Sequence, residues 1–563
     1  MLYFDNSFYK SKQFARKKIM IIVPHEDDEI IMCSEMMEIF RMNECEIYCV
    51  FTTNGDYDGL GEVRIAEALD ALKLWEIPED HAVFLGYGDH WQSEYKHIYH
   101  APDELILKSN IGQTETYGTI NYPEFAMLSD GCHHSYTRKN YLQDIKNVIL
   151  KYLPDILFAI DFDYHPDHRA TSLLFDEAMG QILKQTDYKP QVFKGFAYNM
   201  AWEAERDFFS LNFLSTKRPD KNKLNNALYD TDIPAYKWDN RVRFPIPKSM
   251  FVSKIEKHKS YLAFQKYQSQ NAILHAARVI NSDKVFWERR TDNLAFNSTI
   301  TVSSGNAKYL SDFKLIDCAD ISYEWDKPTK AEFSNFLWIP ESSDERKEIV
   351  YTFEFPQVVS EIVLYENSSF ENHIELMELC INDNEKMKIG HIDNAGGPSV
   401  ISFDTKKEVS KVSLRIIKYD GEEAGLAEVE IFEKQRKPYI IKSLVNDNMV
   451  YRYYAYKEKE INVDIYMYPY DEKVAESLDG YLIDAKKSYV EKISNTKYKI
   501  VCHDKKIKFY IGTGEELFDV FEICRIGMIK KTWLMLLKLP EEIRWFWWRA
   551  SNKIKRTASF IFH

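Results

Sequence analysis

Residues 19–29 read Ile19-Met20-Ile21-Ile22-Val23-Pro24-His25-Glu26-Asp27-Asp28-Glu29, a short apolar run followed at once by a histidine and four carboxylates. A second stretch of this kind lies far downstream, where the apolar residues 156–160 precede Asp161-Phe162-Asp163-Tyr164-His165-Pro166-Asp167-His168. Strand carboxyl ends meet at the crevice where an open α/β sheet binds its ligands, and His with Asp is a donor set for a divalent metal. The two stretches therefore predict a metal site at the edge of a parallel sheet.

Short apolar runs alternate with segments of helical spacing from residue 19 to about residue 290. We expect strands at 47–52 and 82–85 and helices at 29–40, 63–74 and 141–152. This alternation is typical of an α/β fold, a Rossmann-like, mostly parallel sheet with flanking helices. Residues 88–140 interrupt it with an aromatic, polar and weakly periodic insertion, and such an insertion in an α/β enzyme is usually a lid or a substrate loop.

The texture changes beyond residue 292 to short alternating strands, which we expect at 348–355, 360–365, 374–381, 411–417 and 427–432. Turns rich in Asn, Asp and Gly separate them at the intervals of an all-β sandwich. We therefore divide the chain into an α/β domain (1–290), a β-sandwich (291–435), a β-rich domain whose fold the sequence does not identify (436–520) and a short helical tail (521–563).

Composition limits the classes of partner. A chain of 563 residues exceeds the size of a single hydrophobic core, so several domains are expected. The net charge of −14 and the pI near 5.6 exclude a general affinity for nucleic acid. Eight cysteines without a Cys-x-x-Cys pattern indicate reduced thiols rather than a disulfide framework.

The tail differs from the rest of the chain. Residues 521–563 carry nine Lys/Arg against three Glu, a charge of +6, which leaves −20 for residues 1–520. Bulky apolar and aromatic residues lie between the basic ones, as in an amphipathic helix on anionic lipid. A pair of helices packed on the protein or on a partner subunit is the alternative. The first apolar run is only five residues long, too short for a signal peptide, so we expect a cytoplasmic protein, peripheral at the inner face of the membrane if the tail binds lipid.

A hydrolytic metal site needs about three protein ligands and an open position for water. His25, Asp28 and His168 can supply this set, and Asp27 is the adjacent carboxylate for accepting the water proton. His165 is the candidate for meeting the oxyanion and the leaving amine. Two His and one Asp also accept divalent transition ions other than Zn²⁺, so the identity of the metal is weakly coded.

These motifs resemble those of the PIG-L/LmbE-type zinc-dependent N-acetylglucosaminyl deacetylases, over residues 15 to 290. Supporting elements occur in order at Thr53-Asn54-Gly55-Asp56, Arg64 with Glu67-Ala68, Leu85-Gly86-Tyr87-Gly88-Asp89, and Lys259 through Ser269-Gln270. The resemblance implies that the ion is Zn²⁺ and that its ligands are His25, Asp28 and His168. It also implies that Asp27 is the general base and that His165 stabilises the tetrahedral intermediate or protonates the amine.

Other residues carry weaker implications. Arg64 and Asp89 align with positions that contact the amino sugar in such enzymes, although a helix-surface charge and a turn residue are equally good interpretations. The family has Pro where this chain has Glu26, a departure that we expect to be harmless apart from the charge of the rim. Tyr117 and the pair His133-His134 either line the cleft or are ordinary loop residues. Asp163 either orients His165 or caps the following helix.

The second domain resembles the discoidin or coagulation-factor type C family. The landmarks are Asn293-Leu294-Ala295 with Thr301-Val302-Ser303-Ser304, then Phe333-Ser334-Asn335-Phe336-Leu337-Trp338, and finally Gly425-Leu426-Ala427-Glu428-Val429-Glu430-Ile431-Phe432. Such domains often bind glycans through loops at one end of the sandwich, whereas others only buttress an enzyme.

The expected function is metal-dependent hydrolysis of the N-acetyl group of an N-acetylhexosamine-containing glycan, glycolipid or sugar intermediate, in bacterial surface glycan biosynthesis. Hydrolysis of another amide, such as a sugar–thiol conjugate or an antibiotic precursor, is an alternative within the same chemistry. An alternative of a different class is a non-catalytic protein that binds glycan or membrane through its β domains and tail.

Overall fold

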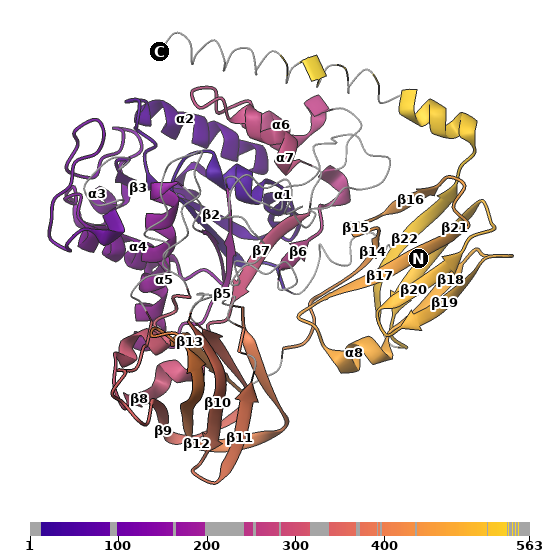
Figure 1. Ribbon diagram of the computed structural model, residues 1–563. Helices are drawn as coiled ribbons and strands as arrows, with labels where there is room; N and C mark the ends of the chain where they lie inside the picture. Colours follow the sequence, from indigo (N-terminus) through magenta and orange to yellow (C-terminus); the bar gives the residue numbers. More distant parts are fainter. Residues whose placement is uncertain are drawn as a thin grey trace.

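The computed structural model (Figure 1) describes residues 13–89, 98–161, 165–197, 241–250, 255–280, 283–315, 337–366, 372–390, 392–393, 397–433, 436–514, 516–536 and single residues of the tail beyond. An α/β domain is followed by two β domains and a short terminal helix, as the sequence predicted. The expected Asp163, residues 90–97 of the insertion and residues 333–336 of the sandwich landmarks lie outside the described residues.

The α/β domain is built on a sheet in the order β3-β2-β1-β4-β5-β7-β6. Its strands are β1 (Lys18–Val23), β2 (Glu46–Thr53), β3 (Ala82–Tyr87), β4 (Ile156–Ile160), β5 (Gln191–Gly195), β6 (Val242–Phe244) and β7 (Lys284–Arg289). The first five are mutually parallel, and β7 and β6 add antiparallel pairs at one edge. Since both faces of a parallel sheet are covered, the central strands β1 and β4 are apolar over Ile19–Val23 and Ile156–Ile160 rather than alternating.

Helices cover both faces of this sheet (Figure 1). The helices are α1 (Asp28–Met42), α2 (Gly61–Leu72), α3 (Phe125–Asp130), α4 (Arg138–Tyr152), α5 (Pro166–Gln185), α6 (Lys259–Phe264) and α7 (Ala276–Val279). Ile19 and Ile21 of β1 pack with α1, α2, α6 and α7, whereas Met20 and Ile22 pack with α4 and α5. The chain leaves β1 toward β2 and later returns to β4 on its other side, so the strand order reverses between β1 and β4, where such sheets bind ligands.

The second domain is a set of antiparallel strands around its own core. They are β8 (Ser298–Val302), β9 (Glu348–Glu366), β10 (His373–Ile381), β11 (Glu385–Gly390), β12 (Ser399–Asp420) and β13 (Leu426–Phe432), in the order β11-β10-β12-β9-β13 with β8 beside β9. The separate strands expected at 348–355 and 360–365 were wrong, because they form one strand. Its register with β12 shifts between Thr352 and Gln357, so an irregularity in the pairing replaces the expected break.

The third domain has two sheets over one core. Its elements are β14 (Ile440–Val445), β15 (Asn448–Met449), β16 (Arg452–Ala455), β17 (Glu460–Tyr468), α8 (Glu472–Ser477), β18 (Asp479–Ile483), β19 (Tyr489–Ser494), β20 (Lys497–Val501), β21 (Lys506–Gly512) and β22 (Leu517–Arg525). The sheet orders are β15-β14-β17-β20-β19 and β16-β22-β21-β18. Arg243 of β6 donates to Asp447 at 2.8 Å, which joins this domain to the α/β sheet.

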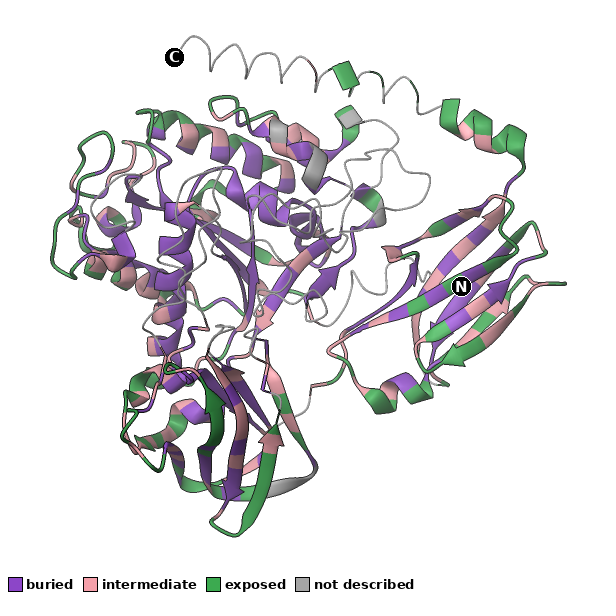
Figure 2. Cartoon of the chain, viewed as in Figure 1, coloured by how far each residue is buried: buried purple, intermediate pink, exposed green. Residues whose placement is uncertain are grey.

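Burial follows the layers (Figure 2), with the central sheet almost wholly covered and the terminal helix mostly exposed. The seven cysteines that the structure describes are free thiols, as expected from their spacing. Within the described residues, no helix is long and apolar enough to cross a membrane.

Candidate metal centre

The turn between β1 and α1 carries the first motif. Asp27 has φ 146° and ψ −24°, a backbone conformation that only glycine adopts without strain. Its carbonyl oxygen accepts the amides of Ile30 at 3.1 Å and Ile31 at 3.0 Å, so the residue begins α1. Its own amide donates to Glu29 Oε2 at 3.1 Å. The turn thus holds the Asp27 carboxylate at the carboxyl edge of the sheet at the cost of backbone strain.

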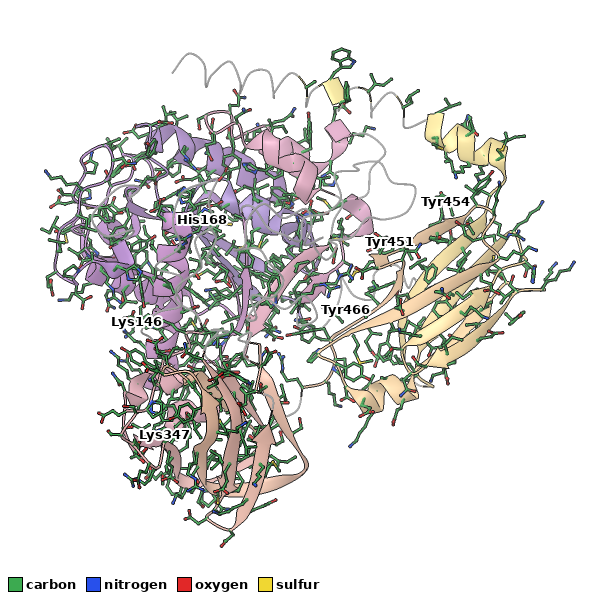
Figure 3. All side chains as sticks on the ribbon, viewed as in Figure 1. Lys146, His168, Lys347, Tyr451, Tyr454 and Tyr466 are labelled. Carbon is green, nitrogen blue, oxygen red and sulfur yellow. The ribbon has the colours of Figure 1, made fainter. Side chains whose placement is uncertain are left out.

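The second motif begins α5. Pro166 is in the first turn of that helix, where its missing N–H costs no hydrogen bond, and His165 is the N-cap. The strands that precede the two motifs are direct neighbours, with Ile22 of β1 paired with Ala159 of β4. This pairing brings the two turns together although about 140 residues separate them, and Figure 3 labels His168 where they meet.

The predicted ligand side chains converge. Asp28 Oδ2 lies 3.2 Å from His25 Nδ1 and 3.2 Å from His168 Nε2. The His165 ring centroid is 4.6 Å from that of His25 and 4.7 Å from that of His168, and one nitrogen from each histidine falls within 4.8 Å of the others. Asp28 Oδ1 is buried and has no hydrogen-bond partner among the described residues. A buried group of imidazole and carboxylate donors at these distances fits a divalent metal.

Electrostatics separate the two adjacent aspartates. Burial opposes ionisation of Asp28, but His168 and His25 hold its pKa well below the usual value. Burial and the charge of Asp28 raise the pKa of Asp27 instead. Adjacent acids whose pKa values are pushed apart are suited to different roles, Asp28 as a permanent anion and Asp27 as a proton acceptor. Burial, followed by the charges of His25 and His168, lowers the pKa of His165 well below its usual value, which favours a neutral imidazole.

The other face of His25 meets a second pair of carboxylates. His25 Nε2 lies 3.3 Å from Asp167 Oδ2 and 3.9 Å from Asp89 Oδ1, and these three residues form a second potential metal-binding group. Burial lowers the pKa of His25, but hydrogen bonds to Asp167 and Asp28 outweigh this effect and raise the pKa well above its usual value. Asp167 lies between the two histidines of its motif and had no predicted role. The structure shows that it orients a predicted ligand.

Comparison with known proteins agrees with this geometry. Residues 20–179 match the model of the family described as GlcNAc-PI de-N-acetylase, PIG-L. They form a PIG-L family domain. The match contains both motifs of the metal centre and ends within α5.

The second domain matches a different family model. Residues 293–432 match a domain of unknown function, DUF7402. Comparison with curated proteins gives no match.

Solved structures similar to part of this chain include small carbohydrate-binding modules. Module CBM32-6 of the GH89 protein of Clostridium perfringens is 18% identical, with 25% of this chain and 99% of that chain covered at a TM-score of 0.18. The lectin domain of lectinolysin complexed with Lewis B antigen is 17% identical, covering 26% and 99% at 0.19. Chitosan-binding module 1 of a Paenibacillus sp. IK-5 chitosanase/glucanase is 18% identical, covering 25% and 98% at 0.18. TM-scores this low carry no conclusion about ligands.

Arg64 reaches the PIG-L motif from α2. Its Nη1 donates to Gly55 O at 3.0 Å, and its Nη2 donates to Gln270 Oε1 at 2.9 Å and to Glu26 O at 3.3 Å. Its Nη2 also lies 4.0 Å from Asp27 Oδ1, so the guanidinium borders the predicted base. The interpretation as a mere helix-surface charge does not fit these contacts. Contact with a sugar stays a prediction.

Glu26 is not a rim residue, contrary to expectation. Its side chain is fully buried, and Oε2 lies 3.4 Å from Arg64 Nε. Burial raises the pKa of Glu26 to about 8, against the opposing charge of Arg64. The glutamate that stands in place of the family's proline therefore contacts Arg64 from a buried position and leaves the charge of the rim unchanged.

Asp89 and Tyr117 form one network beside the centre. Tyr117 donates to Asp56 Oδ2 at 2.7 Å, and Asp56 Oδ1 accepts the Asp89 amide at 2.8 Å. His133 and His134 lie elsewhere in the insertion, where His133 contacts Glu124 and His134 contacts Asp144 and Asp130. Tyr117 therefore lies in the network beside the centre, whereas the contacts of the two histidines fit the alternative of ordinary loop residues.

Sequence reasoning did not identify the support beneath Asp27. Glu29 Oε2 accepts the Asp27 amide, and Glu29 Oε1 accepts a short hydrogen bond from Tyr267, which is fully buried. Burial raises the pKa of Glu29 to about 8. The position of Glu29 in the motif was visible in the sequence, but its partner lies 238 residues downstream and no local signal indicates it.

Proposed function

We propose that the PIG-L domain hydrolyses the N-acetyl group of an N-acetylhexosamine unit in a glycan, glycolipid or sugar intermediate, with Zn²⁺ as the metal. The observation that carries this proposal is the arrangement of Asp28 between His25 and His168, with Asp27 beside them, in a domain of a family described by de-N-acetylation. We further propose that the reaction belongs to bacterial surface glycan assembly, with the protein in the cytoplasm.

His25, Asp28 and His168 would hold the ion, and other divalent transition metals fit the same donors. When bound, the metal would acidify a water molecule and polarise the amide carbonyl. The negative charge that Asp28 keeps in its present surroundings suits it to the cation.

The protein's own groups supply the proton transfers. Asp27 accepts the proton of the attacking water, a role that its raised pKa favours because the ideal base titrates near the working pH. His165 is partly buried and its lowered pKa favours the neutral imidazole, so its ring N–H can donate a hydrogen bond to the oxygen on which negative charge develops. The leaving nitrogen then takes the proton that Asp27 accepted from the water, and acetate and a free amine result.

Arg64 and Asp89 would bind the sugar. Both lie at the centre, Arg64 within 4.0 Å of Asp27 Oδ1 and Asp89 within 3.9 Å of His25 Nε2. A cation and an anion beside the metal centre can fix a hydroxyl-rich ring by hydrogen bonds of opposite polarity. Tyr117 is connected to Asp89 in this sugar-binding group through its hydrogen bond to Asp56.

Acetate release tests the proposal. Metal-loaded protein is incubated with N-acetylglucosamine, its nucleotide-linked form and a lipid-linked form, and the product is identified by mass spectrometry. We expect acetate and a free amino sugar, with kcat lowered at least 100-fold in Asp27→Asn. The matched control is His133→Ala, a histidine of the insertion away from the centre, which should retain activity. Absence of acetate from all of these compounds would favour the alternative hydrolysis of another amide, and full activity of Asp27→Asn would refute the assigned base.

Glycan binding by the sandwich remains a separate proposal that rests on its resemblance to discoidin-type domains. Trp338 and Leu426, from two of the sequence landmarks, are paired and fully buried, so these landmarks build the core rather than a binding surface. A glycan array probed with the Asp27→Asn protein would test binding without turnover. An array without any signal would leave the sandwich a structural support.

A further inference from the structure

The terminal helix presents its apolar side away from the protein. It spans residues 528–536 and follows β22 (Figures 1 and 2). Lys531 lies over the ring of Tyr456 in the third domain, with Nζ 4.2 Å from the ring centroid, so this side of the helix faces the body. Ile529 and Trp533, two residues to either side of Lys531, lie about 200° around the helix from it. Their side chains are 89% and 57% exposed.

The exposed apolar positions continue at helical spacing. Leu536 follows Trp533 by three residues and is 57% exposed, and further along Leu539, Ile543, Phe546 and Trp547 are 45%, 48%, 59% and 66% exposed. These residues are three or four apart, apart from the adjacent pair at the end, which is the spacing of one helix face. A surface helix of a globular protein normally turns such a stripe inward. Here the part of the chain that the structure describes leaves the outward stripe uncovered.

The positive charge of the tail favours a negatively charged surface as its binding partner. The tail carries +6, whereas residues 1–520 carry −20. Lys530 is exposed next to Ile529 and flanks the stripe. An anionic surface would attract the tail and repel the body, which favours contact through the tail alone. Tryptophans among basic residues are typical of helices that lie at the boundary between lipid head groups and acyl chains.

We propose that the outward stripe of the C-terminal helix, with Ile529, Trp533 and Leu536 at its start, binds an anionic lipid surface and attaches the enzyme peripherally to it. The alternative that the tail packs on the body of its own chain does not fit the described residues, because Lys531 rather than the stripe faces the body. Attachment is independent of catalysis, since it uses neither the metal centre nor the proposed sugar-binding residues Arg64 and Asp89.

Vesicle flotation with the full chain tests this proposal. We compare vesicles of pure phosphatidylcholine with vesicles in which about one lipid in three is phosphatidylglycerol, at low and high salt. We expect the protein to float with the anionic vesicles and high salt to weaken binding. The triple variant Ile529→Ser/Trp533→Ser/Leu536→Ser should lose at least tenfold in partitioning. Ile493→Ser, which alters an apolar side chain that is 60% exposed on β19, is the matched control and should bind like the parent.

A second variant separates charge from apolar contact. Lys530→Gln/Lys531→Gln should reduce binding to anionic vesicles roughly tenfold or more and leave the weak binding to neutral vesicles unchanged. Absence of binding to anionic vesicles, or equal binding by the parent and the triple variant, would overturn the proposal. A parent that oligomerises in solution through the stripe, seen by light scattering as a mass that falls in the triple variant, without vesicle binding, would also overturn it in favour of a protein partner.

Discussion

Replacement of Asp27 by glycine should stabilise the metal-free α/β domain while it abolishes hydrolysis. The residue has φ 146° and ψ −24°. A side chain in such a sparsely populated region costs about 1–3 kcal/mol, and the greater freedom of glycine in the unfolded chain offsets ~0.5–1 kcal/mol of the relief. The substitution also removes a buried carboxyl whose Oδ1 has no hydrogen-bond partner among the described residues and whose neighbour is the anion of Asp28. The net gain should be roughly 1–2 kcal/mol.

Hydrogen exchange measures this gain in the correct part of the molecule. Several domains unfold separately, so a single unfolding curve does not define one free energy. Amide exchange in α1 (Asp28–Met42), followed by mass spectrometry in the presence of a chelator, reports the stability of the helix that Asp27 begins. A gain of 1–2 kcal/mol slows exchange through opening by roughly 5- to 30-fold.

Asp27→Asn is the matched comparison, because it removes the negative charge but keeps a side chain at the strained position. Both variants should lose turnover, and only Asp27→Gly should gain stability from the relief of backbone strain. Equal protection of α1 in the two variants, or faster exchange in Asp27→Gly than in Asp27→Asn, would show that the turn is not strained and would refute this reasoning.

Three further outcomes follow from the same structure. Chelation should abolish acetate release and Zn²⁺ should restore it, whereas His168→Ala should lower the metal content of the purified protein at least tenfold, measured by mass spectrometry of the metal. Burial raises the folded-state pKa of Glu29 to about 8 from 4.5. Its contribution to stability is therefore present below pH ~4.5 and is lost as the pH rises through 8. In metal-free protein, Glu29→Gln should make the decline of α1 protection over this pH window less steep, by up to ~1.4 kcal/mol per pH unit. Trp338→Ala removes a fully buried side chain and should destabilise the sandwich by about 3–5 kcal/mol, measured by exchange in β9, while acetate release per bound metal stays unchanged.

The sequence predicted the first four strands and three of the helices of the α/β fold, and the convergence of its two motifs, for the same reason. Apolar runs of about five residues that alternate with segments of helical spacing are typical of buried parallel strands, and such strands have their carboxyl ends at one edge of the sheet. The position of His168 beside Asp28 followed from that rule without any knowledge of side-chain packing. Strand limits were less predictable: β9 continues where a break was expected, because an irregular register is a property of the strand pair and not of one segment.

Residues whose role depends on a distant partner were not predictable. Glu26 was expected to change only the charge of the rim, but Arg64 reaches it from α2 and allows its side chain to be buried. Asp167 was visible between two assigned histidines, yet its contact with His25 depends on the pairing of β1 and β4. In both cases the chemistry of the residue was plain from the sequence, and the unknown was the three-dimensional neighbour.

The same dependence explains why the functional unit extends beyond the family match, which ends at residue 179. Tyr267 donates to Glu29, which holds the amide of the strained Asp27, and Gln270 accepts from Arg64 at 2.9 Å. Both partners lie between α6 and α7, in a segment that the antiparallel strand β7 ties back to β5. The candidate metal ligands therefore lie within residues 20–179, but the conformation of Asp27 and the orientation of Arg64 depend on residues near 270. A chain cut after α5 should retain the metal ligands and lose the geometry that makes them a catalyst.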